Sequence, residues 1–393
     1  MAGKPTVLYL LDYTDLGGGE TSFLALLEEM ARREWPVRPV VILNRPGPVA
    51  ERLAALGIAA EIVGYPLRLR RGPLPWFSPA AAARIGRIAR ERDATLLHAI
   101  HFFGMVYGGF AARRLGLPLV WTCHGWFDVD RPVKRILARR FAAHIACVSD
   151  AVREEASRRI GPGRPVTTNY LGVAPYPDAG PQPARAAVRA ELGVDDATPV
   201  VGMIGRFQPI KGHDLLLDAL RRVLPRRPGL KVWIIGDALF GSVEEAAHRR
   251  RIEARVEAEG LGPVVNFLGF RRDARRVMRA LDLLVIPSAR ESFSMVAVEG
   301  LEAGIPVVGP DGWGPREIIE SPATGLRFRP GDAEDLARCI GALLERTGDG
   351  AAFSPAAGPD RVRRLFSVAA HLERTLAIYR ELTGERTGGE KEN

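Results

Sequence analysis

Short apolar runs alternate with amphipathic stretches along the first 170 residues of the chain. The apolar runs suit strands that are buried on both faces, and the stretches between them have the apolar spacing of helices. This alternation predicts a parallel sheet with helices on both of its faces. The predicted strands are 7–11, 39–43, 95–100, 119–123, 145–149 and 166–170, and the predicted helices include 21–33, 79–91 and 151–159.

A proline-rich segment, 174–183, interrupts this pattern and indicates a linker. The alternation then starts again, which predicts an α/β fold class with two doubly wound, Rossmann-like domains, 1–175 and 190–366, facing each other across a cleft. A loop rich in Gly, Pro and Ala is predicted at 347–359. The predicted strands of the second domain are 200–204, 231–235, 264–268, 283–287 and 306–308; its predicted helices are 215–222, 244–259, 274–280, 296–302, 334–344 and 361–366, and a last helix is expected at 369–382.

The composition is that of an ordinary globular protein, since 47% of the 393 residues are hydrophobic and 26% are charged. Disordered and fibrous classes are thereby excluded. No apolar run approaches the ~18 residues that a membrane-spanning helix needs, and the N-terminus shows no signal-peptide pattern. The cysteines, Cys123, Cys147 and Cys339, form no CxxC pair, which argues against a disulfide framework or a cysteine metal site. These features predict a cytoplasmic protein.

The net charge of +9 is concentrated in the first half of the chain. Up to residue 190 there are 26 basic and 16 acidic residues, against 29 and 30 after it. Such an excess suits an anionic membrane surface, an acidic acceptor or a nucleic acid, but a solvated Arg-rich surface explains it equally well. The basic residues cluster at 68–71 and in a predicted helix that carries Arg131, Lys134, Arg135, Arg139 and Arg140.

Ligands of open parallel sheets bind at the carboxyl ends of the strands, so the residues that follow strands are the candidates. Gly18 and Gly19 follow the first strand and open a helix, where exposed N–H groups can bind an anion, or where a tight turn simply needs glycine. A dinucleotide fingerprint would need glycine in place of Ser22 and an acid after the second strand, where Asn44 stands. These mismatches argue against a dehydrogenase.

Histidine appears at one such strand end. His124 follows a predicted strand and precedes Gly125, which places it on the cleft side. By contrast, His98, His101 and His144 are expected to lack such a position, and the four histidines have no metal-ligand spacing. We therefore expect no metal.

The second domain begins with a strand, Gly205-Arg206, and then Lys211-Gly212. A guanidinium and an ammonium group in one turn suit a diphosphate, the first as a fork and the second as a point charge. Lys211 is one of only five lysines in the chain, which makes a merely solvated cation the weaker interpretation.

A second acidic and helical motif follows the strand at 283–287. Glu291 lies in a short loop, and a helix is expected to begin near Ser294. The first N–H groups, on Ser292, Phe293, Ser294 and Met295, would bind phosphate oxygens, and Glu299 lies deeper in the helix. Carboxylates on either side of an anion site can bind the hydroxyl groups of a sugar and of a ribose. A capping carboxylate and an exposed helix glutamate remain the structural alternative.

The order of these motifs resembles that of the retaining glycosyltransferases of family 4, also known as glycosyl transferases group 1, which have the GT-B fold. The likeness runs from about residue 5 to residue 345. It rests on Gly18-Gly19-x-x-Ser22, His124-Gly125, Val148-Ser149, Gly205-Arg206 with Lys211-Gly212, Glu291-x7-Glu299 and Gly314-x-x-Glu317.

The resemblance implies a nucleotide-diphosphate sugar as donor, a glycan, lipid-linked or small-molecule acceptor, retention of configuration and no metal or other cofactor. The resemblance also implies that the helix 369–382 packs back on the N-terminal domain. The implied roles are donor-sugar contact for His124, Glu291 and the backbone of the loop Ser292 to Met295, diphosphate binding for Gly18, Gly19, Arg206 and Lys211, ribose binding for Glu299 and base contact for Leu268.

Two departures from the family pattern concern the donor site. The family commonly has Glu-Gly-Phe-Gly where this chain has Glu291-Ser292-Phe293-Ser294, and Asn-Gly where this chain has Asn169-Tyr170. Two other functions remain open: a nucleotide-sugar epimerase or hydrolase on the same fold, and a basic nucleic-acid-binding protein. The chain shows no helix-turn-helix, RNA-recognition or zinc pattern, so we expect no nucleic acid as partner. The expected partners also include an anionic membrane surface, with the enzyme peripheral at its inner face.

Overall fold

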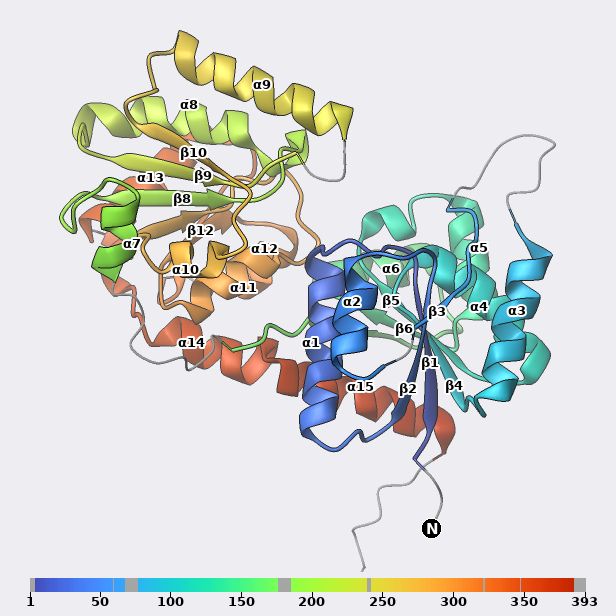
Figure 1. Ribbon diagram of the computed structural model, residues 1–393. Coiled ribbons are helices and arrows are strands. Elements are labelled where there is room, and N and C mark those ends of the chain that lie inside the picture. Colours follow the sequence, from blue (N-terminus) through green and yellow to red (C-terminus); the bar gives the residue numbers. More distant parts are fainter. Residues whose placement is uncertain are drawn as a thin grey trace, which may run out of the picture. The chain divides into compact units, whose positions relative to one another are not determined.

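The computed structural model describes residues 4–58, 60–67, 77–175, 185–238, 242–320, 322–346 and 348–384. The chain divides into two compact units, here called the N-terminal unit (Met1–Ala174 with Phe366–Asn393) and the C-terminal unit (Pro175–Leu365) (Figure 1). Within the described ranges, no helix is both long and apolar enough to span a membrane. The basic run 68–71 and residues 176–183 of the predicted linker lie outside the described residues.

The N-terminal unit contains a seven-stranded parallel sheet in the order β3-β2-β1-β4-β5-β6-β7. The strand order reverses between β1 and β4, which makes this pair the switch point of the sheet. The strands are β1 (Thr6–Leu11), β2 (Arg38–Leu43), β3 (Ala60–Ile62), β4 (Leu96–Ala99), β5 (Leu119–Cys123), β6 (His144–Cys147) and β7 (Val166–Thr168).

Helices cover both faces of this sheet, and one of them comes from the end of the chain. Leu372, Leu376 and Tyr379 of the last helix share a buried core with Leu24 and Leu27 of the first. The helices are α1 (Gly18–Arg32), α2 (Pro48–Ala55), α3 (Pro79–Glu91), α4 (Phe102–Leu115), α5 (Pro132–Phe141), α6 (Asp150–Ile160) and α15 (Val368–Thr383).

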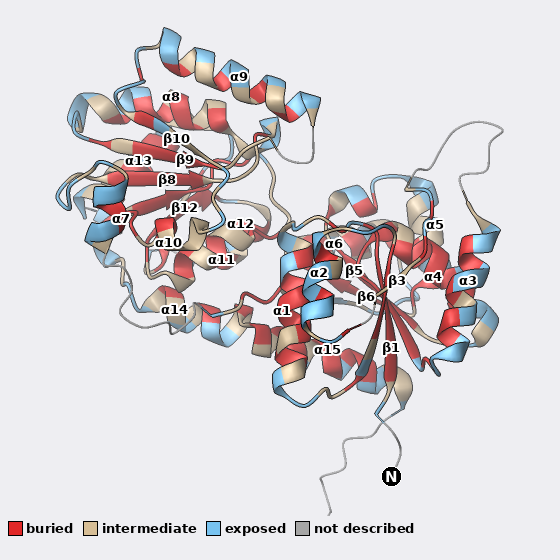
Figure 2. Cartoon of the chain, viewed as in Figure 1, coloured by how far each residue is buried: buried red, intermediate tan, exposed pale blue. Residues whose placement is uncertain are grey.

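The C-terminal unit contains a six-stranded parallel sheet in the order β10-β9-β8-β11-β12-β13, with its switch point between β8 and β11. The inner strands of both sheets are almost wholly buried, whereas most residues of the edge strands β3, β7 and β10 are partly exposed (Figure 2). The strands are β8 (Val200–Ile204), β9 (Lys231–Ile235), β10 (Val265–Gly269), β11 (Leu283–Val285), β12 (Val307–Pro310) and β13 (Gly325–Phe328). The helices are α7 (Arg185–Glu191), α8 (His213–Val223), α9 (Val243–Ala258), α10 (Ala274–Met278), α11 (Met295–Glu302), α12 (Trp313–Ile318), α13 (Ala333–Glu345) and α14 (Ala357–Arg361).

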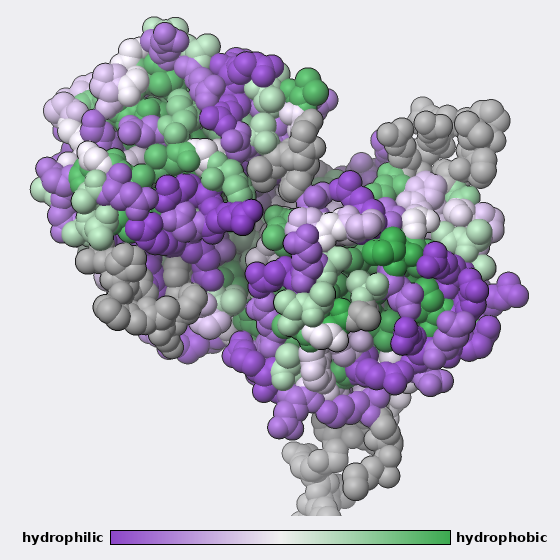
Figure 3. Space-filling view, in the orientation of Figure 1, coloured by the Kyte–Doolittle hydropathy of each residue, from purple (hydrophilic) through white to green (hydrophobic). Residues whose placement is uncertain are grey.

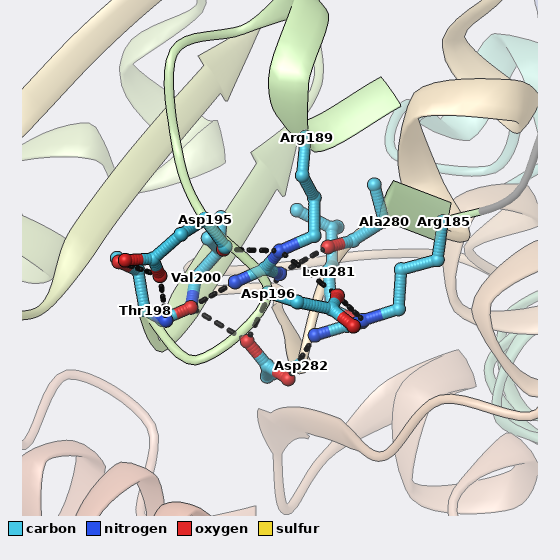
Figure 4. A network of polar contacts seen from close by, with 9 residues as sticks. All are labelled: Arg185, Arg189, Asp195, Asp196, Thr198, Val200, Ala280, Leu281 and Asp282. Atoms are coloured by element: carbon cyan, nitrogen blue, oxygen red, sulfur yellow. Dashed lines mark hydrogen bonds and ion pairs between the residues drawn. The ribbon is translucent and has the colours of Figure 1, made fainter. Parts of the chain in front are cut away.

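A buried guanidinium group fastens the start of the C-terminal unit (Figure 4). The side chain of Arg189 on α7 is fully buried and donates to the carbonyl groups of Asp195, Thr198 and Ala280. Asp282 accepts from Arg185 at 2.5 Å and from the N–H of Val200 at 2.7 Å. Because a buried cation needs such partners, this network holds α7 against the first strand of the sheet.

The α/β fold class is confirmed, and several predicted elements differ in detail. The predicted loop 347–359 is wrong in part, since it contains a 3-10 turn (Gly348–Ala352) and the start of α14. The sequence pattern missed α4, which is apolar on nearly every side and so lacks the polar face that marks a surface helix. It also missed β3 and β13, the outer strands of the two sheets.

Candidate functional site

The candidate residues gather at the switch points of the two sheets, in two groups that are described separately. In the N-terminal unit they follow β1, β4 and β5, and in the C-terminal unit they follow β8 and β11. A ligand at a switch point meets the loops of two strands whose connections run in opposite directions, which leaves the space between them open.

Gly18 and Gly19 form the first turn of α1, as the sequence pattern predicted. Gly18 is exposed and Gly19 partly so, and N–H groups in the first turn of a helix have no partner within it. A Cβ atom on Gly19 would lie 3.0 Å from Cε1 of His124. Glycine is therefore required here for the helix start to approach the histidine ring.

The ring of His124 lies between Gly19 and a second histidine. His101 stacks on it with ring centroids 5.2 Å apart. The ring of His124 hydrogen-bonds the carbonyl of Ile100, while its Nε2 is buried and has no partner among the described residues. Burial and the neighbouring charge of His101 lower the pKa of His124 to about 4. The ring is therefore neutral at pH 7, with one nitrogen able to accept a hydrogen bond.

The expectation that His101 lacks a site position is wrong. His101 directly precedes α4, and its Nε2 lies 3.0 Å from Oε1 of Glu20 on α1. Burial disfavours the imidazolium ion, but the hydrogen bond and charge of Glu20 outweigh burial and raise the pKa of His101. His98 and His144, by contrast, hydrogen-bond the hydroxyl groups of Thr122 and Thr167 on neighbouring strands.

Two further acids that the sequence analysis did not select support this group. Asp12, directly after β1, accepts from the N–H groups of Phe103 and Gly104 at 2.8 and 2.7 Å and so caps α4. Asp128 accepts from the N–H of His124 at 2.8 Å, and burial raises its pKa to about 6. Their positions in the sequence could have revealed Asp12 and His101, because each follows a predicted strand, as His124 does.

In the C-terminal unit, Arg206 and Lys211 lie in the loop between β8 and α8, as predicted. The guanidinium group of Arg206 is 38% exposed and lies 3.4 Å from Oε1 of Glu245, a buried residue on α9. Gln208 donates to the same oxygen at 2.9 Å. Glu245 thus orients Arg206, and the sequence around it carries no signal for that role.

Lys211 contacts the other predicted acid, Glu291. Its Nζ lies 2.8 Å from Oε2 of Glu291, which also accepts from the hydroxyl of Ser288 at 3.1 Å. The two loops approach each other closely at Gly212. This residue has φ +80°, and a Cβ atom on it would lie 2.0 Å from the carbonyl oxygen of Pro287. Only glycine fits at this point.

The helix after Glu291 starts within one residue of the predicted position. α11 begins at Met295, and Ser294 is its N-cap, accepting from the N–H of Ala297 at 3.3 Å. Ser292 and Phe293 therefore precede the helix, and the side chains of Phe293 and Ser294 are buried. Ser294 has φ +97°, a conformation that favours glycine, which the family pattern has at this position.

Two backbone features shape the rest of this loop region. The N–H of Gly314 donates to the carbonyl of Glu291 at 3.1 Å, which ties the Gly314-x-x-Glu317 motif to the Glu291 loop. Leu268 is the extra residue where the register of β10 shifts against β9, and it is partly exposed. A bulge of this kind redirects a side chain from the regular pleat.

Glu299 lies in the second turn of α11 and is partly buried. Burial raises the pKa of its carboxyl group, and the charge of Arg275 opposes this shift. No described residue hydrogen-bonds the carboxylate. A partly accessible carboxylate without a hydrogen-bond donor can receive hydroxyl groups from a ligand.

Asn169, which departs from the family pattern, has a structural role. Its Nδ2 donates to the hydroxyl of Thr375 at 2.9 Å, and its Oδ1 accepts from Arg374 at 3.2 Å. It thereby fixes α15 to the N-terminal unit. Ser22 does the same for α1, since its hydroxyl exchanges hydrogen bonds of 3.0 Å with both backbone groups of Gly172.

The helix predicted to carry the basic cluster is α5, and two of its cations have local partners. Lys134 pairs with Asp130 at 3.0 Å and donates to the carbonyl of Phe127, and Arg135 donates to the carbonyls of Val129 and Asp130. These two side chains therefore donate hydrogen bonds to the carbonyl groups at the end of the preceding loop. Within the described ranges no group of three or more His, Cys, Asp or Glu residues is arranged to hold a metal ion.

Comparison with known proteins agrees with this geometry. Two family models match the chain: Glycosyltransferase Family 4 at residues 16–175 and Glycosyl transferases group 1 at residues 184–357. A D-inositol 3-phosphate glycosyltransferase of Mycobacteroides abscessus is 30% identical over 306 residues, which are 72% of this chain and 67% of that enzyme. The alignment with the enzyme of the same name from Segniliparus rotundus, 31% identical, covers 61% of this chain and 57% of that enzyme.

A 2-deoxystreptamine N-acetyl-D-glucosaminyltransferase of Streptomyces fradiae is 29% identical over 413 aligned positions, 96% of this chain and 94% of that enzyme. Among solved structures, Anabaena Alr3699/HepE in complex with UDP and glucose has a TM-score of 0.80 and 26% identity, and the match covers 96% of this chain and 99% of that one. The predicted GT-B fold class is thereby confirmed, and the chain belongs to the family 4 glycosyltransferases.

Proposed function

We propose that the protein transfers a hexosyl unit from a nucleoside-diphosphate sugar to a hydroxylated acceptor with retention of anomeric configuration. The observation that carries this proposal is the contact of Lys211 with Glu291, with Arg206 on the same loop as Lys211. A cation that neutralises a leaving diphosphate would thus lie beside a carboxylate that can bind sugar hydroxyl groups.

In this proposal Arg206 and Lys211 stabilise the negative charge that develops on the departing diphosphate. Both side chains are partly exposed, so phosphate oxygens can reach them. The N–H groups of Gly18, Gly19 and the loop from Ser292 to Met295 would add uncharged donors. Because protein cations supply the charge, the reaction would need no metal ion.

The carboxylates and the histidine would select the sugar and the nucleotide. Glu291 would bind sugar hydroxyl groups and Glu299 those of the ribose, with Leu268 against the base. His124 is neutral and partly exposed, and its ring would contact the donor sugar. No carboxylate among these residues is assigned as a covalent nucleophile, so we favour attack on the face from which the diphosphate leaves.

The relatives support particular donors and acceptors for a first test. The Anabaena protein was solved with UDP and glucose, which favours UDP-glucose as a donor to try. The names of two relatives include the compounds D-inositol 3-phosphate and 2-deoxystreptamine. Both compounds are polyhydroxylated six-membered carbon rings, so we propose a cyclitol as one acceptor class, beside glycans and lipid-linked sugars.

The test is a transfer assay with UDP-glucose, UDP-N-acetylglucosamine and GDP-mannose, each with and without a cyclitol acceptor. The coupling constant of the product's anomeric proton reports its configuration. An α-linked product from an α-linked donor supports the proposal, and a β-linked product overturns retention. Rapid loss or isomerisation of the donor without any acceptor would instead favour the hydrolase or epimerase.

A cytoplasmic location and attachment to the inner face of a membrane remain part of this proposal. Lys134 and Arg135 contact the preceding loop. The cations that could face an anionic membrane are therefore the N-cap residue Arg131 and, on α5, Arg139 and Arg140. Their exposed side chains would approach anionic headgroups, which attract basic segments near the membrane.

A further inference from the structure

A groove of about 630 Å³ runs between α3 and α4 of the N-terminal unit, away from the switch point. Its lining includes small residues, among them Gly86 and Ala111, and a Cβ atom added at Gly86 would lie 3.6 Å from that of Ala111. Phe77 and Phe110 form one wall, with ring centroids 4.4 Å apart, and Phe110 is 41% exposed. The groove is therefore apolar and open to solvent.

Four arginines border this apolar groove. Arg87 and Arg90 extend from α3, and Arg113 and Arg114 from α4. All four are exposed, and within the described part of the chain none of their guanidinium groups forms a hydrogen bond or an ion pair. None of the described residues that line the groove is acidic.

Many other arginines of the chain are paired with acids. In the N-terminal unit, for example, Arg52 pairs with Glu28 and Arg92 with Glu61, and in the C-terminal unit Arg251 binds both oxygens of Asp214. The cations around the groove instead leave a concentrated positive field without internal compensation.

The apolar and basic character continues onto α5. Phe110 of α4 packs on Phe141 of α5, with ring centroids 4.7 Å apart. On α5, Val133 and Ile136 are 42% and 65% exposed, close in sequence to Arg139 and Arg140, whose guanidinium groups pair with no described residue. Over this unit the surface view shows hydrophobic areas among strongly hydrophilic ones (Figure 3).

We propose that the groove between α3 and α4 binds an anionic phospholipid, with its phosphate on the arginines and hydrocarbon against Phe77 and Phe110. Arginine suits a phosphate because its planar fork donates two parallel hydrogen bonds. The exposed aliphatic side chains on α5 favour lipid over a nucleic acid, whose bases would need free aromatic faces for stacking. This inference deepens the membrane attachment proposed above but uses no step of the transfer reaction.

The test is co-sedimentation of the full chain with vesicles of phosphatidylcholine alone and of phosphatidylcholine mixed with phosphatidylglycerol. The double variant Arg87→Glu/Arg114→Glu removes charge from the groove. The matched control is Arg221→Glu/Arg226→Glu, which changes the net charge equally at exposed arginines of the C-terminal unit that have no ion pair. Thermal unfolding of each variant verifies that it is folded.

We expect the wild type and the control to bind the mixed vesicles, and the groove variant to bind them at least about tenfold more weakly, since each cation near an anionic surface contributes to attachment. Phe110→Ser should weaken the binding that persists at high salt, because that part depends on hydrocarbon contact. Equal losses in both double variants, or no binding to either vesicle, overturn the proposal. So does single-stranded RNA that binds with the same dependence on Arg87 and Arg114.

The vesicle assay and the transfer assay test the two proposals independently of each other. Transfer to a soluble cyclitol reads the reaction without any lipid, whereas vesicle binding is measured without a donor sugar. A protein that transfers sugar but ignores vesicles would therefore disprove only the lipid site, and a protein that binds vesicles without transferring sugar only the proposed reaction.

Discussion

Nζ of Lys211 lies 2.8 Å from Oε2 of Glu291, 80 positions further along the chain. This contact joins the loops that follow β8 and β11, the two strands at the switch point of their sheet. The backbone fixes the same approach, since the N–H of Ala289 donates to the carbonyl of Ile210 at 2.9 Å. The proposed diphosphate and sugar contacts are thus parts of one rigid junction.

The first prediction concerns the charge of Lys211. Lys211→Ala should lower kcat/KM by roughly 10²-fold or more, because a preorganised cation would be missing when the diphosphate departs. Lys231→Ala is the control, since that lysine is partly exposed and, among the described residues, its Nζ donates to the carbonyl of Pro263 alone. Steady-state kinetics with folded variants measures both. Near-normal turnover of the Lys211 variant would contradict the assignment.

A second prediction tests the contact between the start of α1 and His124. Gly19→Ala should lower kcat/KM by up to about tenfold, because the new methyl group would lie 3.0 Å from Cε1 of His124 and shift the ring, and misplaced groups are costly in an active site. Gly341→Ala on α13 is the control, since a Cβ atom there meets nothing within 4 Å. Equal activity of the two variants would show that the ring position does not matter.

The third prediction uses the conformation of Ser294. Ser294→Gly should keep or raise the free energy of unfolding, because glycine accepts φ +97° without strain and loses little as an N-cap. Ser294→Ala should lower that free energy by about 1 kcal/mol, since it removes the bond to Ala297 and keeps the strain. Urea unfolding compares the two variants, and an alanine variant as stable as the glycine variant would contradict this account.

A fourth prediction concerns stability at acid pH. Burial and the charge of Arg374 lower the pKa of His371 on α15 to about 3, whereas an unfolded histidine titrates near ~6.5. Between these values the unfolded chain binds a proton that the folded chain does not, so this residue reduces stability as the pH falls below ~6.5. The loss is about 1.4 kcal/mol per pH unit at most.

His371→Asn removes this titration and also alters the bond that Nδ1 accepts from the N–H of Gly172 at 3.2 Å. The variant should be less stable than the wild type at pH 7, and the difference should narrow by roughly 1 to 2 kcal/mol at pH 5. Urea unfolding at the two pH values measures it. A difference that stays constant between them would show that His371 does not titrate as described.

The fifth prediction is that transfer needs no divalent metal. Activity should survive EDTA, because Arg206 and Lys211 are proposed to supply the charge that a metal ion supplies in other enzymes. The assay compares initial rates with EDTA and with added Mg²⁺ or Mn²⁺. Complete loss with EDTA and recovery with either metal would overturn the proposed roles of these two cations.

The sequence by itself determined the α/β architecture and the sheet edge at which the candidate residues lie. Buried parallel strands appear as continuous apolar runs, so β5, β8 and β9 were predicted with the limits that the structure has. A residue that directly follows such a strand must lie at the carboxyl edge of its sheet. For this reason local reading found Gly19, His124, Arg206, Lys211 and Glu291 without any knowledge of the strand order.

Only the tertiary structure decided which of these residues meet and which others support them. Glu245 reaches Arg206 from α9, and His101 reaches His124 because β4 and β5 are neighbours in the sheet. Periodicity assigns a residue to a face or an edge, but it does not contain the order of the strands or the path of a loop. Long-range side-chain contacts depend on that order, so they appear only when the chain has folded.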